Sequence, residues 1–350
     1  MADRHASTFL ASLRELTLSR IREFLREPEA VFWVFGFPVI MTIALGIAFR
    51  SRTDEPVIVA VERLAGAEAV RAALETAGGF VLRDVPAGGV ERALRDGIVQ
   101  VVVVPGTPAT YRFDPARAES QVARLAVDRA LQQAAGRRDA FTPREDAVRA
   151  VGSRYIDWLV PGLLGMNIMG TGMWSTSFAI VTARTRKLLK RFAATPMPRS
   201  AYLASLIGSR LAFLVLEGVV LVAFAWLSFD VVVHGSLAAL AVVSLLGALA
   251  FGGIALLVAS RAKTVEGVSG LLNLVMLPMW VFSGVFFASS NFPEAMQPFV
   301  QALPLTALND ALRGVMNDGE TLASLWRELA LLAGWGGVSF AAALKLFRWS

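Results

Sequence analysis

Long hydrophobic runs separated by short charged segments make up most of this chain. Residues 30–49, 158–183, 235–260 and 267–293 contain no Asp, Glu, Lys or Arg. Each run reaches the roughly 20 residues that a helix needs to cross about 30 Å of hydrocarbon. Two weaker runs carry charge: Arg210 and Glu217 interrupt 202–229, and Lys345 lies near the end of a sixth run. The pattern predicts a polytopic α-helical membrane protein with six transmembrane helices, at about 30–49, 158–183, 202–229, 235–260, 267–288 and 325–347.

The charges of the short loops predict how these helices are oriented. Five Lys or Arg residues precede the first run and six lie within 184–199. Arg261 and Lys263 follow the run at 235–260, and Lys345 and Arg348 lie at the end of the sixth run. The segment 288–321 has one Arg against four acids. Because cytoplasmic loops are enriched in Lys and Arg, we expect the basic segments and both termini in the cytoplasm.

Residues 1–29 are expected to form an amphipathic helix on the cytoplasmic membrane surface. Hydrophobic residues recur there at near-helical spacing among arginines. A helix packed on a soluble partner is the alternative. A cleaved signal peptide fits the first run less well, since the region before it is about thirty residues long and mixes acids with bases. We therefore interpret the first run as an uncleaved helix.

Between residues 50 and 157 the composition becomes that of a soluble domain, with sixteen basic and fifteen acidic residues interspersed. Short β-branched or alternating segments predict strands at 57–61, 80–85, 101–104 and 110–113, and helices are predicted at 67–77, 90–95 and 116–135. This alternation favours a small α/β domain, inserted after the first transmembrane helix on the extracytoplasmic side. The insert contains neither a Gly-x-Ser-x-Gly elbow nor a metal-ligand spacing. A catalytic or metal site is therefore not expected.

Composition agrees with a membrane protein: 55% of the residues are hydrophobic, 18% are charged, and the mean hydropathy is +0.56. The net charge of +6 could suggest nucleic acid, but the basic residues lie beside hydrophobic runs, where they set orientation and meet lipid headgroups. Nucleic-acid binding is not expected. With no cysteine, disulfides and thiolate chemistry are excluded.

Arg210 and Glu217 are the charges most deeply placed in a predicted membrane helix. Their spacing of seven residues puts them on nearly the same face, two turns apart. A charge near mid-depth costs on the order of 2.5 to 3.5 kcal/mol on insertion scales. Glu217 should therefore face a partner helix, face a cavity or be protonated. It either lines a transmembrane path or forms an interhelical clamp, and the spacing alone leaves direct pairing with Arg210 open.

Prolines and a glycine interrupt the run at 267–293 and the segment that follows it. Pro278, Gly284, Pro293 and Pro304 disfavour one straight helix, and irregular backbone survives at membrane depth only when protein buries it or it lines water. We therefore expect 289–313 to enter the membrane partway from the outer face and return, as a gate, with Arg313 near the outer interface. A loop lying flat on the outer surface is the alternative.

Local motifs in an ordered set carry a family resemblance. Lys190-Arg191 leads to Thr195-Pro196, and the sequence Ser-Gly-Val-Phe-Phe at 283–287 is followed by Phe-Pro at 292–293, Leu-Pro-Leu-Thr at 303–306 and Arg313. This chain resembles the permease subunits of ABC-2 type transporters, in the branch with a large external domain after the first transmembrane helix. It departs from them at 183–187, where many relatives have an acidic residue and a glycine.

The resemblance implies a pore-forming subunit that exports a substrate across a bacterial or archaeal plasma membrane. It implies as partners a second permease copy or paralogue, membrane lipids and two cytoplasmic ABC ATPase subunits. The sequence has no phosphate-binding loop, so the chain is not expected to be an enzyme or to bind a cofactor, and ATP and Mg²⁺ would be bound by the partner subunit. The resemblance assigns ATPase coupling to Arg184, Arg186, Lys187, Lys190, Arg191, Thr195 and Pro196.

Orientation and headgroup binding would explain the charge of this loop without any coupling role. Two other classes of function remain: an ion-coupled secondary transporter with Glu217 as its ion site, and a membrane scaffold or sensor that uses the external domain. The regions before and after the insert show no repeat of hydropathy, which many secondary transporters have. The sequence does not reveal the substrate.

Overall fold

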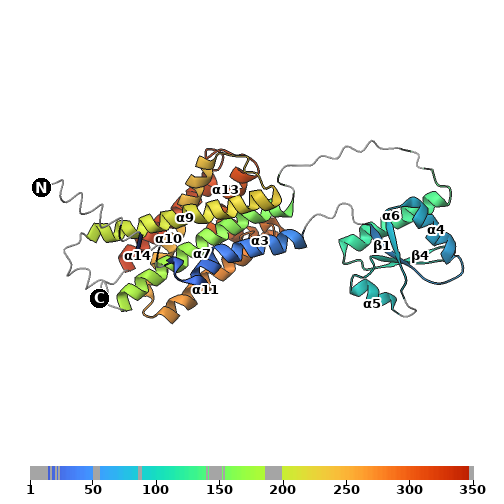
Figure 1. Ribbon diagram of the computed structural model, residues 1–350, viewed down its shortest axis with the longest axis horizontal. Coiled ribbons are helices and arrows are strands. Elements are labelled where there is room, and N and C mark those ends of the chain that lie inside the picture. Colours follow the sequence, from blue (N-terminus) through green and yellow to red (C-terminus); the bar gives the residue numbers. More distant parts are fainter. Residues whose placement is uncertain are drawn as a thin grey trace. The chain divides into compact units, whose positions relative to one another are not determined.

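The computed structural model describes residues 24–49, 56–85, 89–138, 154–185 and 199–346, with isolated positions at 15, 18, 19, 22, 141 and 152. The side chains of 199–209 and of Ala30 lie outside this description. The chain divides into two compact units (Figure 1). One comprises Met1–Ser51 and Arg149–Ser350, and the other comprises Arg52–Val148. We refer to them as the helical unit and the α/β unit.

The first apolar helix of the helical unit is built from three consecutive segments. α2 (Pro28–Val31) leads into a π-helical turn, η1 (Phe32–Gly36), and then into α3 (Phe37–Ala48). Pro28 begins the helix without losing a hydrogen bond, because the N–H of the first helical residue has no intrahelical partner. The predicted amphipathic helix at 1–29 lies mostly outside the described residues. Its described positions from 15 to 25 are helical.

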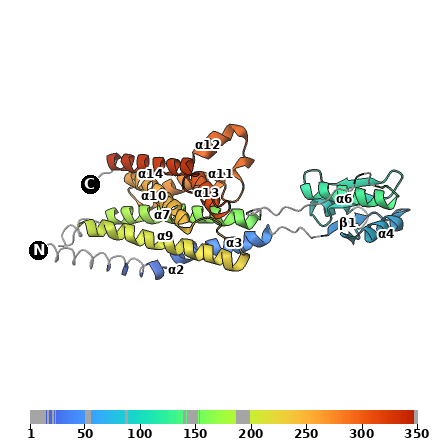
Figure 2. The same cartoon turned by 90° about the horizontal axis from the view of Figure 1, so that it is seen from above.

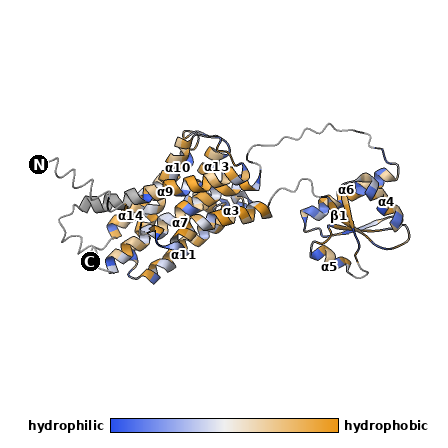
Figure 3. Ribbon diagram, in the orientation of Figure 1, coloured by the Kyte–Doolittle hydropathy of each residue, from blue (hydrophilic) through white to orange (hydrophobic). Residues whose placement is uncertain are grey.

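Five longer helices complete the scaffold of this unit: α7 (Tyr155–Thr185), α9 (Arg199–Phe229), α10 (Leu237–Arg261), α11 (Val265–Phe282) and α14 (Trp326–Leu346). Within the described residues, four helices are long and apolar enough to cross a membrane: residues Arg210–Phe229 of α9, then α10, α11 and α14. Hydrophobic residues dominate the coloured parts of these helices (Figure 3). Many large side chains are exposed, among them Val215, Leu274 and Val338, as lipid-facing positions require.

The other two predicted membrane helices differ from these four. The apolar helix Phe32–Ala48 is shorter, and α7 is a 31-residue helix that includes the buried polar residues Asp157 and Asn167. α7 also begins three residues earlier than predicted, because Tyr155 and Asp157 belong to its first turn and not to the soluble insert. In two perpendicular views α7 and α9 run side by side (Figures 1 and 2).

The fifth predicted membrane helix ends earlier than expected. Pro278 is accommodated inside α11, and the helix stops at Phe282 instead of continuing to 288. The break comes at Gly284, whose φ of +70° is accessible to glycine at little cost. The chain then forms the short segments η2 (Ser289–Asn291), η3 (Glu294–Met296) and α12 (Gln297–Ala302), followed by α13 (Pro304–Met316).

α13 is a buried helix held by close backbone approaches. Of its 13 residues, 12 are buried. It packs on α7 at Gly165, where any Cβ would collide with Oδ1 of Asn309. It packs on α10 at Gly247, where a Cβ would lie 2.7 Å from Leu308. α10 also meets α14 through small residues, since a Cβ on Gly253 would lie 2.8 Å from the carbonyl oxygen of Gly336. Small residues at such crossings let helices approach closely in a membrane.

The α/β unit is a four-stranded sheet in the order β2-β1-β3-β4. β1 (Val57–Val61) is parallel to β2 (Phe80–Arg83) and β3 (Val101–Val104), and β4 (Thr110–Phe113) is antiparallel to β3. α4 (Ala67–Ala77) and α6 (Ala118–Ala134) cover one face and α5 (Val90–Arg95) covers the other. All four strands and three helices lie at the predicted positions, with end differences of one or two residues.

Candidate functional site

The basic loop between α7 and α9 lies almost entirely outside the described residues. This holds for Arg186, Lys187, Lys190, Arg191, Thr195 and Pro196. Arg184, in the last turn of α7, is described. Its Nη1 donates to the carbonyl oxygens of Ala259 at 3.3 Å and Ala262 at 3.0 Å, at the end of α10. A cation there satisfies carbonyls that a helix end leaves unpaired, so Arg184 joins the ends of α7 and α10.

A buried ion pair within α9 is bonded to α7 between the ends of the two helices. Nη1 of Arg210 lies 3.3 Å from Oε1 of Glu217, so the pairing that the sequence left open is present. Glu217 is 2% exposed, and its second oxygen accepts a hydrogen bond from Oγ1 of Thr171 at 3.0 Å. Nη2 of Arg210 donates to the carbonyl oxygen of Ile168 at 3.2 Å. Both residues of this ion pair are therefore attached to the same stretch of α7.

The same stretch of α7 also contacts the first apolar helix. Nδ2 of Asn167 donates to the carbonyl oxygen of Val34 at 3.1 Å, and Val34 lies in the π-helical turn. A π-turn leaves backbone carbonyls less well matched to their own helix, and such turns are frequent at functional sites. Asn167, Thr171, Arg210 and Glu217 thus form one polar cluster, which we call the mid-helix clamp, joining three helices.

Arg313 is buried inside the helical unit, and its position near the outer membrane interface stays a prediction. It is 5% exposed, its Nη2 donates to the carbonyl oxygen of Gly284, and its guanidinium carbon lies 3.4 Å from the ring centroid of Trp158. The carboxylate of Asp310 is 3.5 Å from Nη1. Arg313 therefore connects α13, the break after α11 and the first turn of α7, combining a cation–π contact with charge-assisted hydrogen bonds.

Further polar groups are buried around this break. Nδ2 of Asn309 donates to the carbonyl oxygen of Ser283 at 2.8 Å. Oδ1 of Asn309, Oγ of Ser283 and Oγ1 of Thr306 are buried without a hydrogen-bond partner among the described residues. A buried polar atom without a hydrogen bond lowers the stability of the fold, so three of them around one break need an explanation other than packing. Of the predicted gate residues, the structure brings together Gly284 and Arg313, whereas Pro293 and Pro304 only begin η3 and α13.

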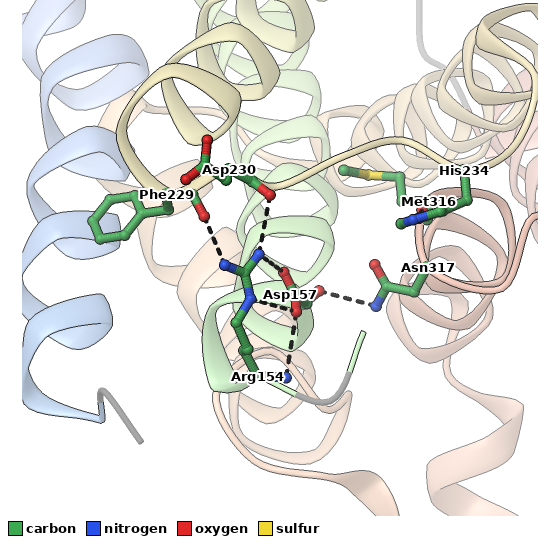
Figure 4. A network of polar contacts seen from close by, with 7 residues as sticks. All are labelled: Arg154, Asp157, Phe229, Asp230, His234, Met316 and Asn317. Atoms are coloured by element: carbon green, nitrogen blue, oxygen red, sulfur yellow. Dashed lines mark hydrogen bonds and ion pairs between the residues drawn. The ribbon is translucent and has the colours of Figure 1, made fainter. Parts of the chain in front are cut away.

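A second network, which sequence reasoning missed, lies at the other end of α7 from the basic loop (Figure 4). Nε and Nη2 of Arg154 donate to the two carboxylate oxygens of Asp157 at 2.9 and 2.7 Å. The guanidinium also donates to the carbonyl oxygens of Phe229 at 2.9 Å and Asp230 at 3.1 Å, which α9 leaves unpaired at its C-terminal end. The hydrogen bond from Arg154 to Asp157 raises the pKa of Arg154, which keeps its positive charge.

α13 joins the same network. Nδ2 of Asn317 donates to the carbonyl oxygen of Asp157 at 3.0 Å, and the backbone N–H of His234 donates to the carbonyl oxygen of Met316 at 2.9 Å (Figure 4). The network therefore fastens α7, the end of α9, the connection to α10 and the end of α13. The only sequence signal was the three-residue spacing of Arg154 and Asp157 before a hydrophobic run.

Comparison with known proteins places this arrangement in a family. The model of the ABC-2 type transporter family matches residues 122–317, which is more than half of the chain. The chain belongs to the ABC-2 type transporter family. The match begins within α6 and continues through α7, α9, α10 and α11 to the end of α13. It therefore includes the basic loop, the mid-helix clamp and the Arg313 site.

Three curated relatives illustrate the range of similarity. Nodulation protein J of Bradyrhizobium diazoefficiens is 27% identical over 57% of this chain and 76% of its own length. The inner membrane transport permease YadH of Escherichia coli is 25% identical over 46% of this chain and 63% of its own length. ABC transporter G family member 20 of Dictyostelium discoideum is 27% identical over 52% of this chain, which spans only 25% of that protein. The chain is a polytopic, mostly helical membrane protein of a family of transport permeases.

Proposed function

We propose that this chain is the membrane-spanning subunit of an ABC exporter, driven by ATP hydrolysis on a separate ATPase subunit. In this proposal six helices cross a bacterial or archaeal plasma membrane, both termini lie in the cytoplasm, and the α/β unit lies outside. A second permease chain and the surrounding lipids complete the membrane part. ATP and Mg²⁺ belong to the partner subunit.

The observation that carries the proposal is the mid-helix clamp. α7 ends and α9 begins at the two sides of the basic loop, so any force applied to that loop acts on both helices. Thr171 and Ile168 on α7 are bonded to Glu217 and Arg210 on α9, which makes the two helices move together. Asn167 extends this rigid group to the first apolar helix. An ATPase docked at the loop would therefore move three helices as a single body.

The position of α13 supports a re-entrant segment. Its 13 residues span about 20 Å, too short to cross a bilayer. It nevertheless packs on α7 and α10 along its length and is almost wholly buried. Backbone that enters the membrane partway is stable when protein surrounds it in this manner. We infer that α12 and α13 form the outer gate, with Arg313 holding α13 against the break at Gly284.

Asn273 supports the presence of a second permease chain. It lies at the middle of α11 and is exposed on the helical unit, surrounded by the exposed apolar residues Leu271, Leu274 and Leu277. A side-chain amide facing hydrocarbon is unfavourable, whereas amides form hydrogen bonds across helix interfaces within membranes. A second chain, or a polar path between two chains, would cover it.

An ion-coupled secondary transporter is less well supported. Such a protein would need Glu217 to exchange its ligand, yet both of its carboxylate oxygens are already engaged, by Arg210 and Thr171, and the side chain is 2% exposed. This arrangement is typical of an interhelical clamp.

Membrane topology tests the proposal, because a cytoplasmic ATPase can reach the basic loop only from inside. The chain contains no cysteine, so single cysteines can be introduced without background. In intact cells we expect Thr185→Cys to be protected from an impermeant thiol reagent and Glu75→Cys, in α4 of the α/β unit, to be labelled. Opening the membrane should expose position 185. Labelling of position 185 in sealed cells would contradict the proposed orientation and the function built on it.

A further inference from the structure

The α/β unit ends in an edge strand with an unpaired side. β4 pairs with β3 through residues from Thr110 to Phe113, and no other described strand pairs with it. Pro108 and Pro115 flank the strand and lack an N–H group, so only the few residues between them can donate hydrogen bonds outward. A sheet edge of this kind is a template for pairing with another chain, within a narrow window of residues.

The two faces of β4 differ. Tyr111 and Phe113 point toward α6, where the hydroxyl of Tyr111 donates to Asp128 at 3.0 Å and the guanidinium of Arg124 lies 5.3 Å from the Phe113 ring. Burial and the bond to Asp128 raise the pKa of Tyr111 to about 12, so its hydroxyl stays protonated. Arg112 points to the opposite face, is exposed, and has no ion-pair partner within the described part of the chain.

A groove follows the exposed face of this edge. It has a volume of about 470 Å³ and is lined by Val90, Glu91 and Leu94 of α5 together with β4 and Pro115. An incoming strand would thus find backbone partners along β4 and a partly apolar wall at α5. This combination of sheet edge and helix wall suits the addition of an extended strand.

We propose that β4 pairs in an antiparallel manner with β4 of a second copy of this chain, with Phe113 opposite Phe113 and Arg112 opposite Asp114 of the second copy. The four-stranded sheets of two α/β units would then become one continuous eight-stranded sheet around a two-fold axis. The inference rests on the proposed function to the extent that the membrane part also brings two copies together.

Geometry and charge together select this register. Because side chains alternate between faces, residues that are directly opposite must lie on the same face, which permits only registers centred on a residue. Centring on Arg112 would place two arginines opposite each other, which is destabilising. Centring on Tyr111 would place Arg112 opposite Thr110 with no opposite charge. Centring on Phe113 forms two Arg112–Asp114 pairs, one on each side of the axis.

Asp114 can accept this contact in addition to the two that it already makes. One of its oxygens accepts from the backbone N–H of Ala116 at 2.9 Å, and the other lies 3.5 Å from Nε of Arg117. A carboxylate offers about four acceptor positions, so two contacts do not saturate it. Asp114 is partly exposed and follows directly on β4, which places it at the end of the open edge.

Cysteine crosslinking in native membranes tests the pairing, because the natural chain has no cysteine. Arg112→Cys and Asp114→Cys chains that carry different tags are co-expressed at full length. An oxidation catalyst is then added, so that cysteines in direct proximity form a disulfide. Directly opposite residues have Cβ atoms about 4.5 to 5.5 Å apart, near the span of a disulfide. We expect a covalent dimer at twice the 37.6 kDa of the single chain, containing both tags. The remaining Arg112–Asp114 pair of that dimer stays intact.

The matched control uses the opposite edge of the same sheet. Val81 and Arg83 are exposed on β2, two residues apart on one face, and co-expressed Val81→Cys and Arg83→Cys chains should give no such dimer. A separate membrane sample that contains Asn273→Cys is oxidised in the same way, and a disulfide dimer there shows that two copies meet within the membrane. Crosslinking at Asn273 without crosslinking between 112 and 114 would overturn the β4 pairing and leave the proposed function standing. Crosslinking at the β2 edge alone would also overturn the β4 pairing. So would protection of Arg112→Cys from a soluble thiol reagent without any dimer, because another partner would then cover the β4 edge.

Discussion

Glu217 shows how a costly residue is accommodated within an apolar helix. Its carboxylate is held on one side by Arg210 of its own helix and on the other by Thr171 of α7. The seven-residue spacing placed the two charges on one face of α9, but it could not reveal Thr171 or Ile168, because contacts between helices far apart in sequence leave no local pattern. Arg210 reaches Glu217 because its long side chain spans the two turns.

Replacing Glu217 by Gln should destabilise the protein. Breaking a buried ion pair costs about 3 to 5 kcal/mol, because the remaining charge stays buried without its partner, and the amide recovers a part of this through its hydrogen bonds. Thermal unfolding of the purified protein measures the effect. Adding Arg210→Gln should restore part of the loss. Val215→Ala, on the exposed side of α9, is the control and should change stability by less than about 0.5 kcal/mol. Unchanged stability in Glu217→Gln would show that the carboxylate is no clamp.

Arg154 is a second residue whose role depends on its distant partners. We expect Arg154→Gln to lower stability by about 1 kcal/mol, since its charge-assisted hydrogen bonds are strong but its side chain is half exposed. The loss of stability should appear first at the C-terminal end of α9, as faster amide hydrogen exchange at residues 226–235. Arg92→Gln removes a more exposed ion pair in the α/β unit and serves as the comparison, with almost no expected effect. Equal exchange in both variants would argue against the fastening role.

Elements were predictable where one local rule dominates. Short β-branched or alternating patterns located the strands, and apolar runs without charged residues located most of α10 and α11. The prediction was wrong about the end of α11, because hydrophobicity continues to Phe287 while the backbone turns at Gly284. Pro278 suggested a break that does not occur. The burial of Arg313 could not be predicted either, since its Trp158 partner lies 155 residues away in sequence.

The contact between α7 and α13 depends on the absence of a side chain at Gly165. Gly165→Ala should force α13 away from α7, because the added Cβ would collide with the amide of Asn309. We expect a loss of about 1 to 3 kcal/mol, the range of overpacked cores, measured as a lowered unfolding temperature. Gly218→Ala in α9 is the matched control: nothing lies within 4 Å of its Cβ position, and alanine favours a helix by about 1 kcal/mol. If Gly165→Ala is as stable as Gly218→Ala, the close approach of α13 is not required.

The whole chain joins two units with different physical tasks. The helical unit exposes large apolar side chains and buries two groups of polar residues, the mid-helix clamp and the group around Arg313. The α/β unit has the usual soluble arrangement, with an apolar core on both faces of its sheet. Hydropathy separated the two units in the sequence, and ordered motifs indicated the family. The basic loop that would couple the chain to its ATPase was recognised from its charge and those motifs, and all but its ends lie outside the described residues.

ATP hydrolysis by the reconstituted complex tests the central claim most directly. The chain and its ATPase subunit are placed in lipid vesicles, and the hydrolysis rate is compared between the natural chain and the variant Lys190→Glu with Arg191→Glu. The account predicts that the reversed charges leave membrane insertion intact but abolish the stimulation of hydrolysis, because the ATPase no longer docks. Arg261→Glu with Lys263→Glu, in the connection between α10 and α11, makes the same change of charge and should retain stimulation. Undiminished stimulation in the 190/191 variant would contradict coupling through this loop.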